Sequence, residues 1–225
     1  MILTAKELES LVNVQQRSPH ALLGVHPLGD GSGLVVRAFL PDAAAVEIVP
    51  VHEKARPAFK LKRLHEAGVF EGVTRDANRV YAYDLVVTDR QGDRRRTRDP
   101  YSFLPTLGET DLYLFGQGNE SRIYDKLGSK LRVIDGVPGV SFAVWAPNAQ
   151  RVSVVGDFNG WDGRIHSMRH LGPSGVWEIF IPGVGEGALY KYEIKDGSGA
   201  LILRPTRMVF SSNPRPKTPP SSGTS

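Results

Sequence analysis

The chain has 225 residues, of which 40% are hydrophobic and 23% charged, with a net charge of +4 and no cysteine. This length allows one or two domains with a sizeable core, and the lack of cysteine excludes disulfides and thiolate metal sites. Because no apolar run approaches the ~20 residues of a membrane span and the N-terminus lacks a signal-peptide pattern, we expect a cytoplasmic protein with no membrane partner.

The first predicted element is a short helix within residues 1–18. Thr4 and Glu7 have the spacing of a capping box, in which the two side chains satisfy backbone N–H groups at a helix start. Leu8 and Leu11 follow at helical spacing, so we predict one amphipathic helix over about residues 5–16. It ends before Pro19, because the residue that precedes a proline avoids the α region.

Strand patterns dominate the rest of the chain. The segments are short, rich in β-branched or aromatic residues, and separated by Gly, Pro, Asp and Asn. Many short strands at such spacing are typical of antiparallel β-sandwiches. The predicted strands cover residues 34–40, 45–51, 69–73, 80–87, 140–145, 151–155, 176–181, 189–194 and 200–203.

The two halves of the chain contain the same sequence pattern. Residues 36–43 align with residues 142–149, and residues 81–83 align with residues 190–192, in the same order and at nearly the same offset. Self-similarity of this kind indicates a repeated structural unit. We therefore predict an all-β protein with two tandem immunoglobulin-like β-sandwich domains.

The repeat also predicts the domain boundaries. The first sandwich covers residues 19–105, and the second covers residues 127–204. Between them, residues 106–126 contain Asp and Thr before an apolar run that ends in Gly, as in a short helical connector. Residues 205–225 are mostly Pro, Ser, Thr and Lys and are expected to be disordered. With one permitted choice of codons for residues 205–210, the neighbouring reading frame encodes Asp-Pro-Tyr-Gly-Phe. This suggests that the tail is translated out of frame.

A loop after the predicted strand at 151–155 is the candidate binding element. It reads Gly-Asp-Phe-Asn-Gly-Trp-Asp over residues 156–162, and Gly and Asn favour its sharp bend. An indole face suits the apolar side of a sugar ring, and short polar groups suit its hydroxyls. Phe158 fits core packing better than binding, whereas Trp161 fits both equally well. The first copy lacks this loop, so we assign binding to the second copy and a structural role to the first.

The basic residues predict no nucleic-acid partner. The only dense run is Arg94–Arg98, flanked by Asp93 and Asp99. A solvated loop or edge strand explains such a run, and no aromatics alternate with it to stack on bases. The six histidines lack zinc-motif spacing, and no Ser/His/Asp set or phosphate loop occurs, so we expect no catalytic residue, no metal and no cofactor in this chain.

Six motifs occur in a characteristic order: His20–Pro27, Asp99–Phe103, Glu109–Gly116, Tyr124–Gly128, Phe142–Ala149 and Val155–Asp162. In this order the chain resembles, over residues 18–204, the N-terminal region of bacterial 1,4-α-glucan branching enzymes of glycoside hydrolase family 13. The second sandwich resembles a family 48 carbohydrate-binding module.

The resemblance implies an enzyme of glycogen biosynthesis that cleaves an α-1,4-glucan and rejoins the piece through an α-1,6 bond. Such a retaining reaction uses two carboxyl groups about 5–5.5 Å apart, which in the family lie on a (β/α)₈ barrel after these modules. A barrel of ~250 residues does not fit in the short segment after Arg204, so we expect this chain to be inactive alone.

By family position, the glucan-binding candidates are Trp161, Asn159 and Lys191, although Lys191 fits an exposed strand lysine equally well. The expected partner is α-1,4-glucan, as glycogen, amylopectin or malto-oligosaccharides. No second aromatic follows the Asp196-Gly197 turn, which predicts weak binding. Two other interpretations stay open. One is a stand-alone glycogen- or starch-binding scaffold module, and the other is a secreted β-sandwich adhesion protein, which the missing signal and cysteines disfavour.

Overall fold

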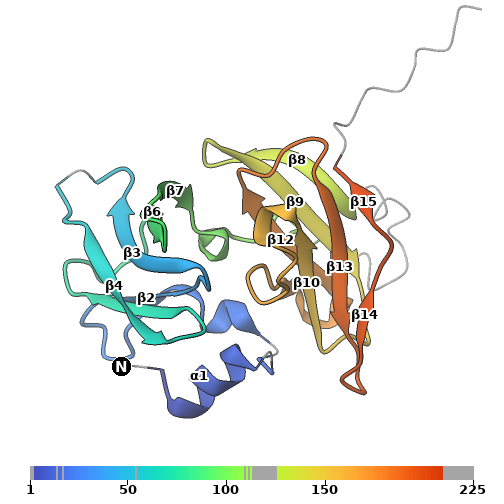
Figure 1. Ribbon diagram of the computed structural model, residues 1–225, viewed down its shortest axis with the longest axis horizontal. Coiled ribbons are helices and arrows are strands. Elements are labelled where there is room, and N and C mark those ends of the chain that lie inside the picture. Colours follow the sequence, from blue (N-terminus) through green and yellow to red (C-terminus); the bar gives the residue numbers. More distant parts are fainter. Residues whose placement is uncertain are drawn as a thin grey trace, which may run out of the picture.

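The computed structural model describes residues 3–13, 15–16, 18–53, 55–108, 110, 112 and 126–209. Two β domains lie side by side, and helix α1 lies beside the first (Figure 1). Within these residues, no helix is long and apolar enough to cross a membrane.

Helix α1 (Ala5–Val12) begins with the predicted capping box. Thr4 Oγ1 accepts from the Glu7 N–H, and the Glu7 carboxylate accepts from the Thr4 N–H at 2.8 Å. The helix ends earlier than expected, with Asn13 at its C-cap, because asparagine readily leaves the helical conformation. Leu11 is buried in a small cluster that also contains Phe39, so α1 packs on the first domain.

The first domain is one antiparallel sheet that folds over its own core, in the order β1-β2-β5-β4-β3-β6-β7. The first residues of β4 pair with β3 and its last residues pair with β5, so β4 passes from one layer to the other. Fully buried side chains such as Ile48, Phe70 and Tyr83 fill the space between the layers. The strands are β1 (Gly24–Pro27), β2 (Leu34–Phe39), β3 (Ala43–Pro50), β4 (Phe59–His65), β5 (Val69–Thr74), β6 (Tyr83–Asp89) and β7 (Arg94–Arg98).

The second domain is a sandwich of two antiparallel four-stranded sheets. One sheet has the order β11-β12-β9-β8, and in the other β13 pairs with β10, β14 and β15. Phe142, Val154 and Tyr190 are among the residues buried between the sheets. The strands are β8 (Gly128–Ile134), β9 (Val137–Trp145), β10 (Arg151–Gly156), β11 (Arg169–His170), β12 (Val176–Pro182), β13 (Leu189–Lys195), β14 (Leu201–Leu203) and β15 (Arg207–Met208).

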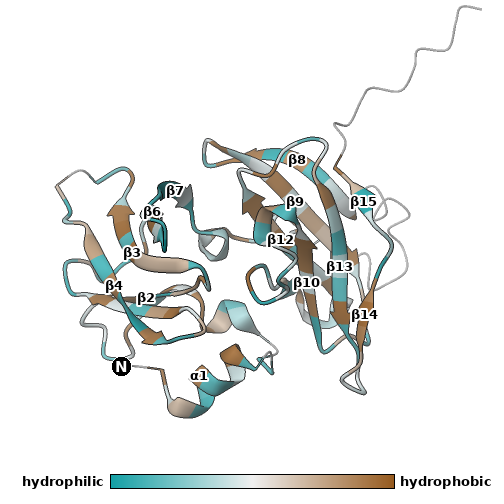
Figure 2. Cartoon of the chain, in the orientation of Figure 1, coloured by the Kyte–Doolittle hydropathy of each residue, from teal (hydrophilic) through white to brown (hydrophobic). Residues whose placement is uncertain are grey.

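The all-β prediction is confirmed, and each predicted strand overlaps an observed one. The sequence did not reveal β1, β4, β7, β8, β11 and β15. Several of these carry many charged residues, as β7 does in Figure 2, where it is coloured hydrophilic. The arginine run therefore forms an edge strand, one of the two alternatives expected for it.

The end of the second domain lies beyond its predicted boundary. Strand β15 pairs with Leu189 and Tyr190 of β13, and Val209 is fully buried in the core. Residues 205–209 are therefore part of the sandwich, because Val209 fills a core position that composition alone did not indicate. The rest of the predicted tail, residues 210–225, lies outside the described residues. Most of the predicted helical connector, Glu109–Gly116, also lies outside them.

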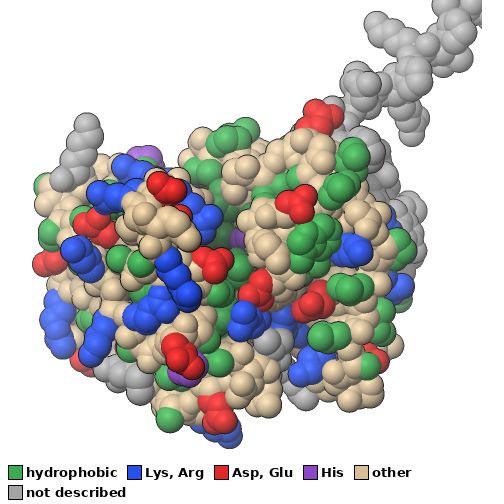
Figure 3. Space-filling model, in the orientation of Figure 1, with side chains coloured by type: hydrophobic (Ala, Val, Ile, Leu, Met, Phe, Trp, Pro, Cys, Tyr) green, Lys and Arg blue, Asp and Glu red, His purple; other side chains and the backbone are tan. Residues whose placement is uncertain are grey.

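The two domains contact each other through residues that follow β7. The Tyr101 hydroxyl donates to the Ile165 carbonyl at 2.9 Å and accepts from the Ser167 N–H at 3.1 Å. The Phe103 and Phe180 rings pack edge to face, with centroids 4.6 Å apart. The surface of the molecule is hollowed between the two domains, as the space-filling view shows (Figure 3).

Gly68, in the turn between β4 and β5, has φ +99, and an added Cβ would lie 2.5 Å from the Leu40 carbonyl oxygen. We expect Gly68→Ala to lower the free energy of unfolding by about 2–4 kcal/mol, from backbone strain and overpacking together. Gly92→Ala is the matched control, because Gly92 has φ +94 but no atom within 4 Å of its Cβ position. Urea unfolding gives the loss in free energy of unfolding for each variant, and the difference between the two losses is the steric contribution at Gly68. Equal losses would show that the close approach to Leu40 costs nothing.

Candidate functional site

The candidate loop follows β10 and begins with a 3₁₀ turn, Asp157–Asn159. Gly160 and Trp161 both have left-handed backbones, with φ of 59° and 61°. For tryptophan this conformation costs on the order of 1–2 kcal/mol. The loop retains it through backbone hydrogen bonds, including one of 3.0 Å from the Trp161 N–H to the Gly156 carbonyl. A strained non-glycine residue of this kind is more common at functional sites than elsewhere.

Trp161 presents its indole to solvent, with 40% of the residue exposed. Its Nε1–H donates to Asp157 Oδ1 at 2.8 Å, which fixes the ring relative to the loop. Phe158, by contrast, packs toward the core, and its ring stacks on Phe142 with centroids 6.3 Å apart. The structure therefore separates the two aromatic residues of the loop into one that fills the sandwich and one that faces outward.

Lys191 lies beside this indole. It is opposite Val155 in the pairing of β13 with β10, immediately before the loop. Its Nζ lies 5.6 Å from the centroid of the Trp161 ring, within cation–π range. The structure thus brings two of the three sequence candidates together as a ring and a cation on one surface, where a ligand could contact both.

Asn159 differs from the expectation of an amide that is open to a ligand. The residue is only 8% exposed, and its Oδ1 accepts from the Gly156 N–H at 3.0 Å. Its Nδ2 donates to the Val154 carbonyl at 2.8 Å and to His166 Nδ1 at 2.9 Å. Both hydrogens of the amide are therefore engaged, by β10 and by His166, and Asn159 supports the loop from inside.

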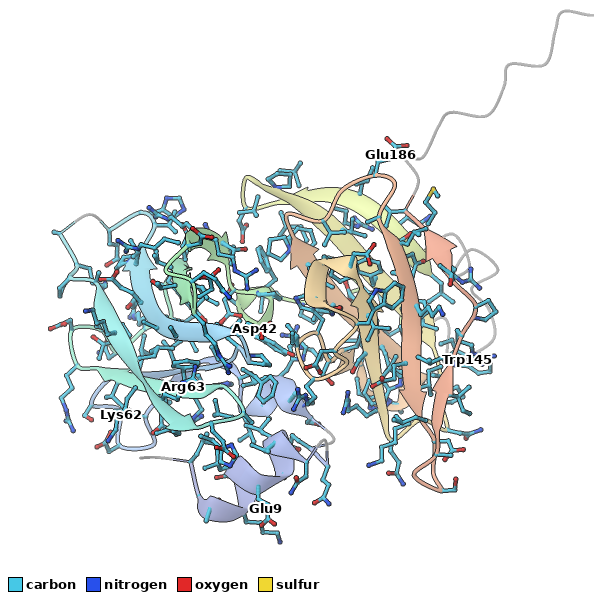
Figure 4. All side chains as sticks on the ribbon, in the orientation of Figure 1. Glu9, Asp42, Lys62, Arg63, Trp145 and Glu186 are labelled. Carbon is cyan, nitrogen blue, oxygen red and sulfur yellow. The ribbon has the colours of Figure 1, made fainter. Side chains whose placement is uncertain are left out.

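A second exposed tryptophan, Trp145, was not singled out from the sequence. It is 52% exposed and lies at the end of β9, on the outer side of the second domain (Figure 4). Its Nε1–H donates to the Ser174 carbonyl at 3.2 Å. The third tryptophan, Trp177, is 3% exposed and donates to the Ala146 carbonyl. The second domain thus exposes two indoles at different places, so variants of Trp145 serve as a comparison for variants of Trp161.

Several titratable groups near the domain contact have shifted pKa values. Burial, with a further contribution from Arg95, lowers the pKa of His166 to about 3. Burial likewise lowers the pKa of His20 to about 3. Burial raises the pKa of Asp99 to about 6, although hydrogen bonds from Tyr83 and from the backbone of Tyr101 act in the opposite direction. Above pH 7 both histidines are therefore neutral and Asp99 is ionised.

Known proteins are similar to both halves of the chain. The family described as "alpha-1,4-glucan branching enzyme GlgB, N-terminal domain" matches residues 4–101. The family "Carbohydrate-binding module 48 (Isoamylase N-terminal domain)" matches residues 126–212. Among curated proteins, "1,4-alpha-glucan branching enzyme GlgB" of Myxococcus xanthus is 46% identical over 94% of this chain. The protein of the same name from Rubrobacter xylanophilus is 49% identical over 87% of it.

The chain spans 28% and 26% of the length of these two relatives. Among solved structures, ligand-free PulA from Klebsiella pneumoniae is similar over 82% of this chain and 20% of that one, at 18% identity and a TM-score of 0.30. A pullulanase from Anoxybacillus sp. LM18-11 is similar over 79% of this chain and 24% of that one, at 14% identity and a TM-score of 0.28. Likeness this distant carries no argument about function.

Proposed function

We propose that this chain is the N-terminal part of a 1,4-α-glucan branching enzyme and that its second domain binds α-1,4-glucan. The similarity of both halves of the chain to that family supports the proposal. The complete protein then forms α-1,6 branches in cytoplasmic glycogen, with the catalytic carboxylates outside this chain. The role of residues 126–209 in that reaction is to hold a glucan chain. No reaction step is assigned to a residue of this chain.

The exposed indole of Trp161 beside Lys191 is the observation that carries the proposal. A glucosyl unit has an apolar C–H face that packs on an indole and hydroxyls that hydrogen-bond to an ammonium. Asp157 holds the ring in place before the ligand arrives, which reduces the ordering cost of binding. Asn159 supports this arrangement from inside the loop, so its role is to position Trp161 rather than to contact sugar.

A stand-alone glucan-binding scaffold is the second candidate. The supporting observation is that the second sandwich has its own buried core, which includes Val140, Met168 and Val209. A domain with such a core presents its binding loop without help from a catalytic barrel. Both candidates therefore predict glucan binding by the chain alone, and they differ only in whether a barrel accompanies it.

Affinity electrophoresis in gels that contain amylopectin or glycogen tests the proposal. With one aromatic contact, we expect a Kd of about 10⁻⁴–10⁻³ M, equivalent to about 4–5 kcal/mol. Mobility of the chain should fall in these gels and recover when maltoheptaose is added, whereas dextran should leave it unchanged. Equal mobility in all gels would contradict the proposal.

A further inference from the structure

A cavity of about 530 Å³ lies between the two domains. The first domain contributes residues 38–43, around the turn from β2 to β3, together with part of β7. The second domain contributes residues 157–160 of the candidate loop and residues 181–184, where β12 ends. The volume lies within the about 300–1,000 Å³ that is typical of small-molecule sites, and interfaces between domains are a common place for them.

Arg95 supplies a positive charge to this cavity. It lines the cavity from β7, and no ion-pair partner for it occurs among the residues that the structure describes. Its neighbours differ, since Arg94 pairs with Glu47 at 3.4 Å and Arg96 pairs with Asp84 at 2.7 Å. Of these three arginines, Arg95 is the one that faces the cavity, and its guanidinium can therefore bind a ligand.

Two exposed carboxylates line the cavity from opposite domains. Asp42 lies between the domains (Figure 4), and within the described part of the chain its carboxylate has no hydrogen-bond or ion-pair partner. Asp157 uses Oδ1 to hold the Trp161 indole, and no bond to its Oδ2 is seen among the described residues. Asp157 therefore belongs both to the Trp161 surface and to the cavity, so the two regions are continuous.

His166 adds a hydrogen-bond donor whose orientation is fixed. The Gly156 N–H requires an acceptor, so Asn159 Oδ1 faces it and Asn159 Nδ2 faces His166. His166 Nδ1 must then be the acceptor, which places the ring hydrogen of the neutral imidazole on Nε2. Nε2 has no partner among the described residues, and His166 lines the cavity.

We propose that this interdomain cavity binds the end of a neutral α-glucan chain, as a second position for the ligand that lies on Trp161. Asp42 and Asp157 accept hydrogen bonds from sugar hydroxyls, and Arg95 and His166 donate to sugar oxygens. Phe158 and Val184 are among the apolar side chains that face the C–H groups. The two carboxylates disfavour an anionic ligand, because they would repel it. The inference rests on the proposed function, since it extends the same ligand from one domain to the next.

Titration of the ¹⁵N-labelled chain with maltotriose tests this inference by NMR. The backbone amides of Gly183 and Val184 report on the cavity, and the indole N–H of Trp161 reports on the loop surface. Both sets of resonances should shift in the wild-type chain. Arg95→Ala should weaken the response of the cavity amides about tenfold or more, because it removes a charged hydrogen-bond donor. Arg94→Ala, one residue away and facing Glu47, should leave that response within twofold.

The outcomes separate the two proposals. If the Trp161 indole shifts while Gly183 and Val184 do not at saturating maltotriose, the cavity site is wrong and glucan binding stands. If neither set shifts, both proposals are wrong. If inorganic phosphate moves Gly183 and Val184 as strongly as maltotriose does, or if Arg95→Ala behaves like Arg94→Ala, the neutral-sugar assignment of the cavity is overturned.

Discussion

Replacement of Trp161 by alanine is expected to abolish retention of the chain by amylopectin or glycogen. Aromatic residues at the centre of a binding surface commonly contribute about 2 kcal/mol or more. Loss of that amount from a total of about 4–5 kcal/mol weakens binding about 30-fold and moves the Kd above 10⁻³ M, beyond the range of the gel assay. Because Trp161 is 40% exposed and lies outside the core, the free energy of unfolding should change by only about 0.5 kcal/mol.

Trp145→Ala is the matched control for this variant. Trp145 is 52% exposed, and its indole also donates to an oxygen of the protein. It differs from Trp161 in lying at the end of β9, in the other sheet of the second domain. We expect this variant to be retained like the wild-type chain. Equal loss of retention in both variants would mean that no single indole forms the binding surface.

Acid should destabilise the chain strongly between pH 6.5 and pH 4. The folded-state pKa of His20 and of His166 is about 3, below the ordinary value of 6.5. Their contribution to stability is therefore complete above pH 6.5 and is lost as pH falls toward 3. By pH 4 the two histidines together remove about 6 kcal/mol.

Asp99 opposes this trend. Its folded-state pKa is about 6, above the ordinary value of 3.8, so its effect on stability is most favourable below pH 3.8 and is lost as pH rises through 6. On going from pH 7 to pH 4, Asp99 restores about 2 kcal/mol, which leaves a net loss of about 4 kcal/mol. His20 and Asp99 lie in the first domain and largely offset each other, so about 3 kcal/mol of the loss falls on the second domain through His166. For a domain with a total stability of about 5–15 kcal/mol, this is a large fraction.

Urea unfolding at pH 7 and pH 4, followed by tryptophan fluorescence, measures this loss. His20→Phe keeps an aromatic ring against Tyr101, which His20 now contacts at a centroid distance of 4.7 Å, but it cannot be protonated. The difference in the free energy of unfolding between pH 7 and pH 4 should shrink by about 3 kcal/mol in this variant. His52→Gln, at an exposed position, should leave it unchanged. A wild-type chain that is as stable at pH 4 as at pH 7 would contradict the account.

Local patterns in the sequence were sufficient for the helix start and for the apolar strands. The Thr4–Glu7 capping box depends on a four-residue spacing, and a strand such as β12 has buried residues along almost its whole length. Strands β7 and β8 are edge strands. The exposed residues of β7 are arginines and those of β8 are Leu131, Arg132 and Val133, so neither strand has the alternation of hydrophobicity that identifies a half-buried strand. Their pairing depends on partners elsewhere in the chain, which local sequence does not specify.

Only part of the candidate site was predicted, again because local sequence does not specify contacts with distant residues. The turn residues around Trp161 predicted a loop but left open whether its indole packs in the core or faces outward, and the structure places the indole at the surface. Asn159 has a polar side chain and was expected to face a ligand, but its burial is decided by contacts with Val154 and His166. The cavity could not be inferred at all, because Arg95 and Asp157 line the same space only when the two domains are in place.

The indole N–H resonances of the three tryptophans give the most direct test of the account. In a maltoheptaose titration of the ¹⁵N-labelled chain, we expect the Trp161 resonance to shift progressively toward saturation at millimolar ligand, because its indole lies on the binding surface. The resonances of Trp145 and Trp177 should stay in place. A shift of the Trp145 resonance while that of Trp161 remains unchanged would contradict the assignment of the glucan-binding surface.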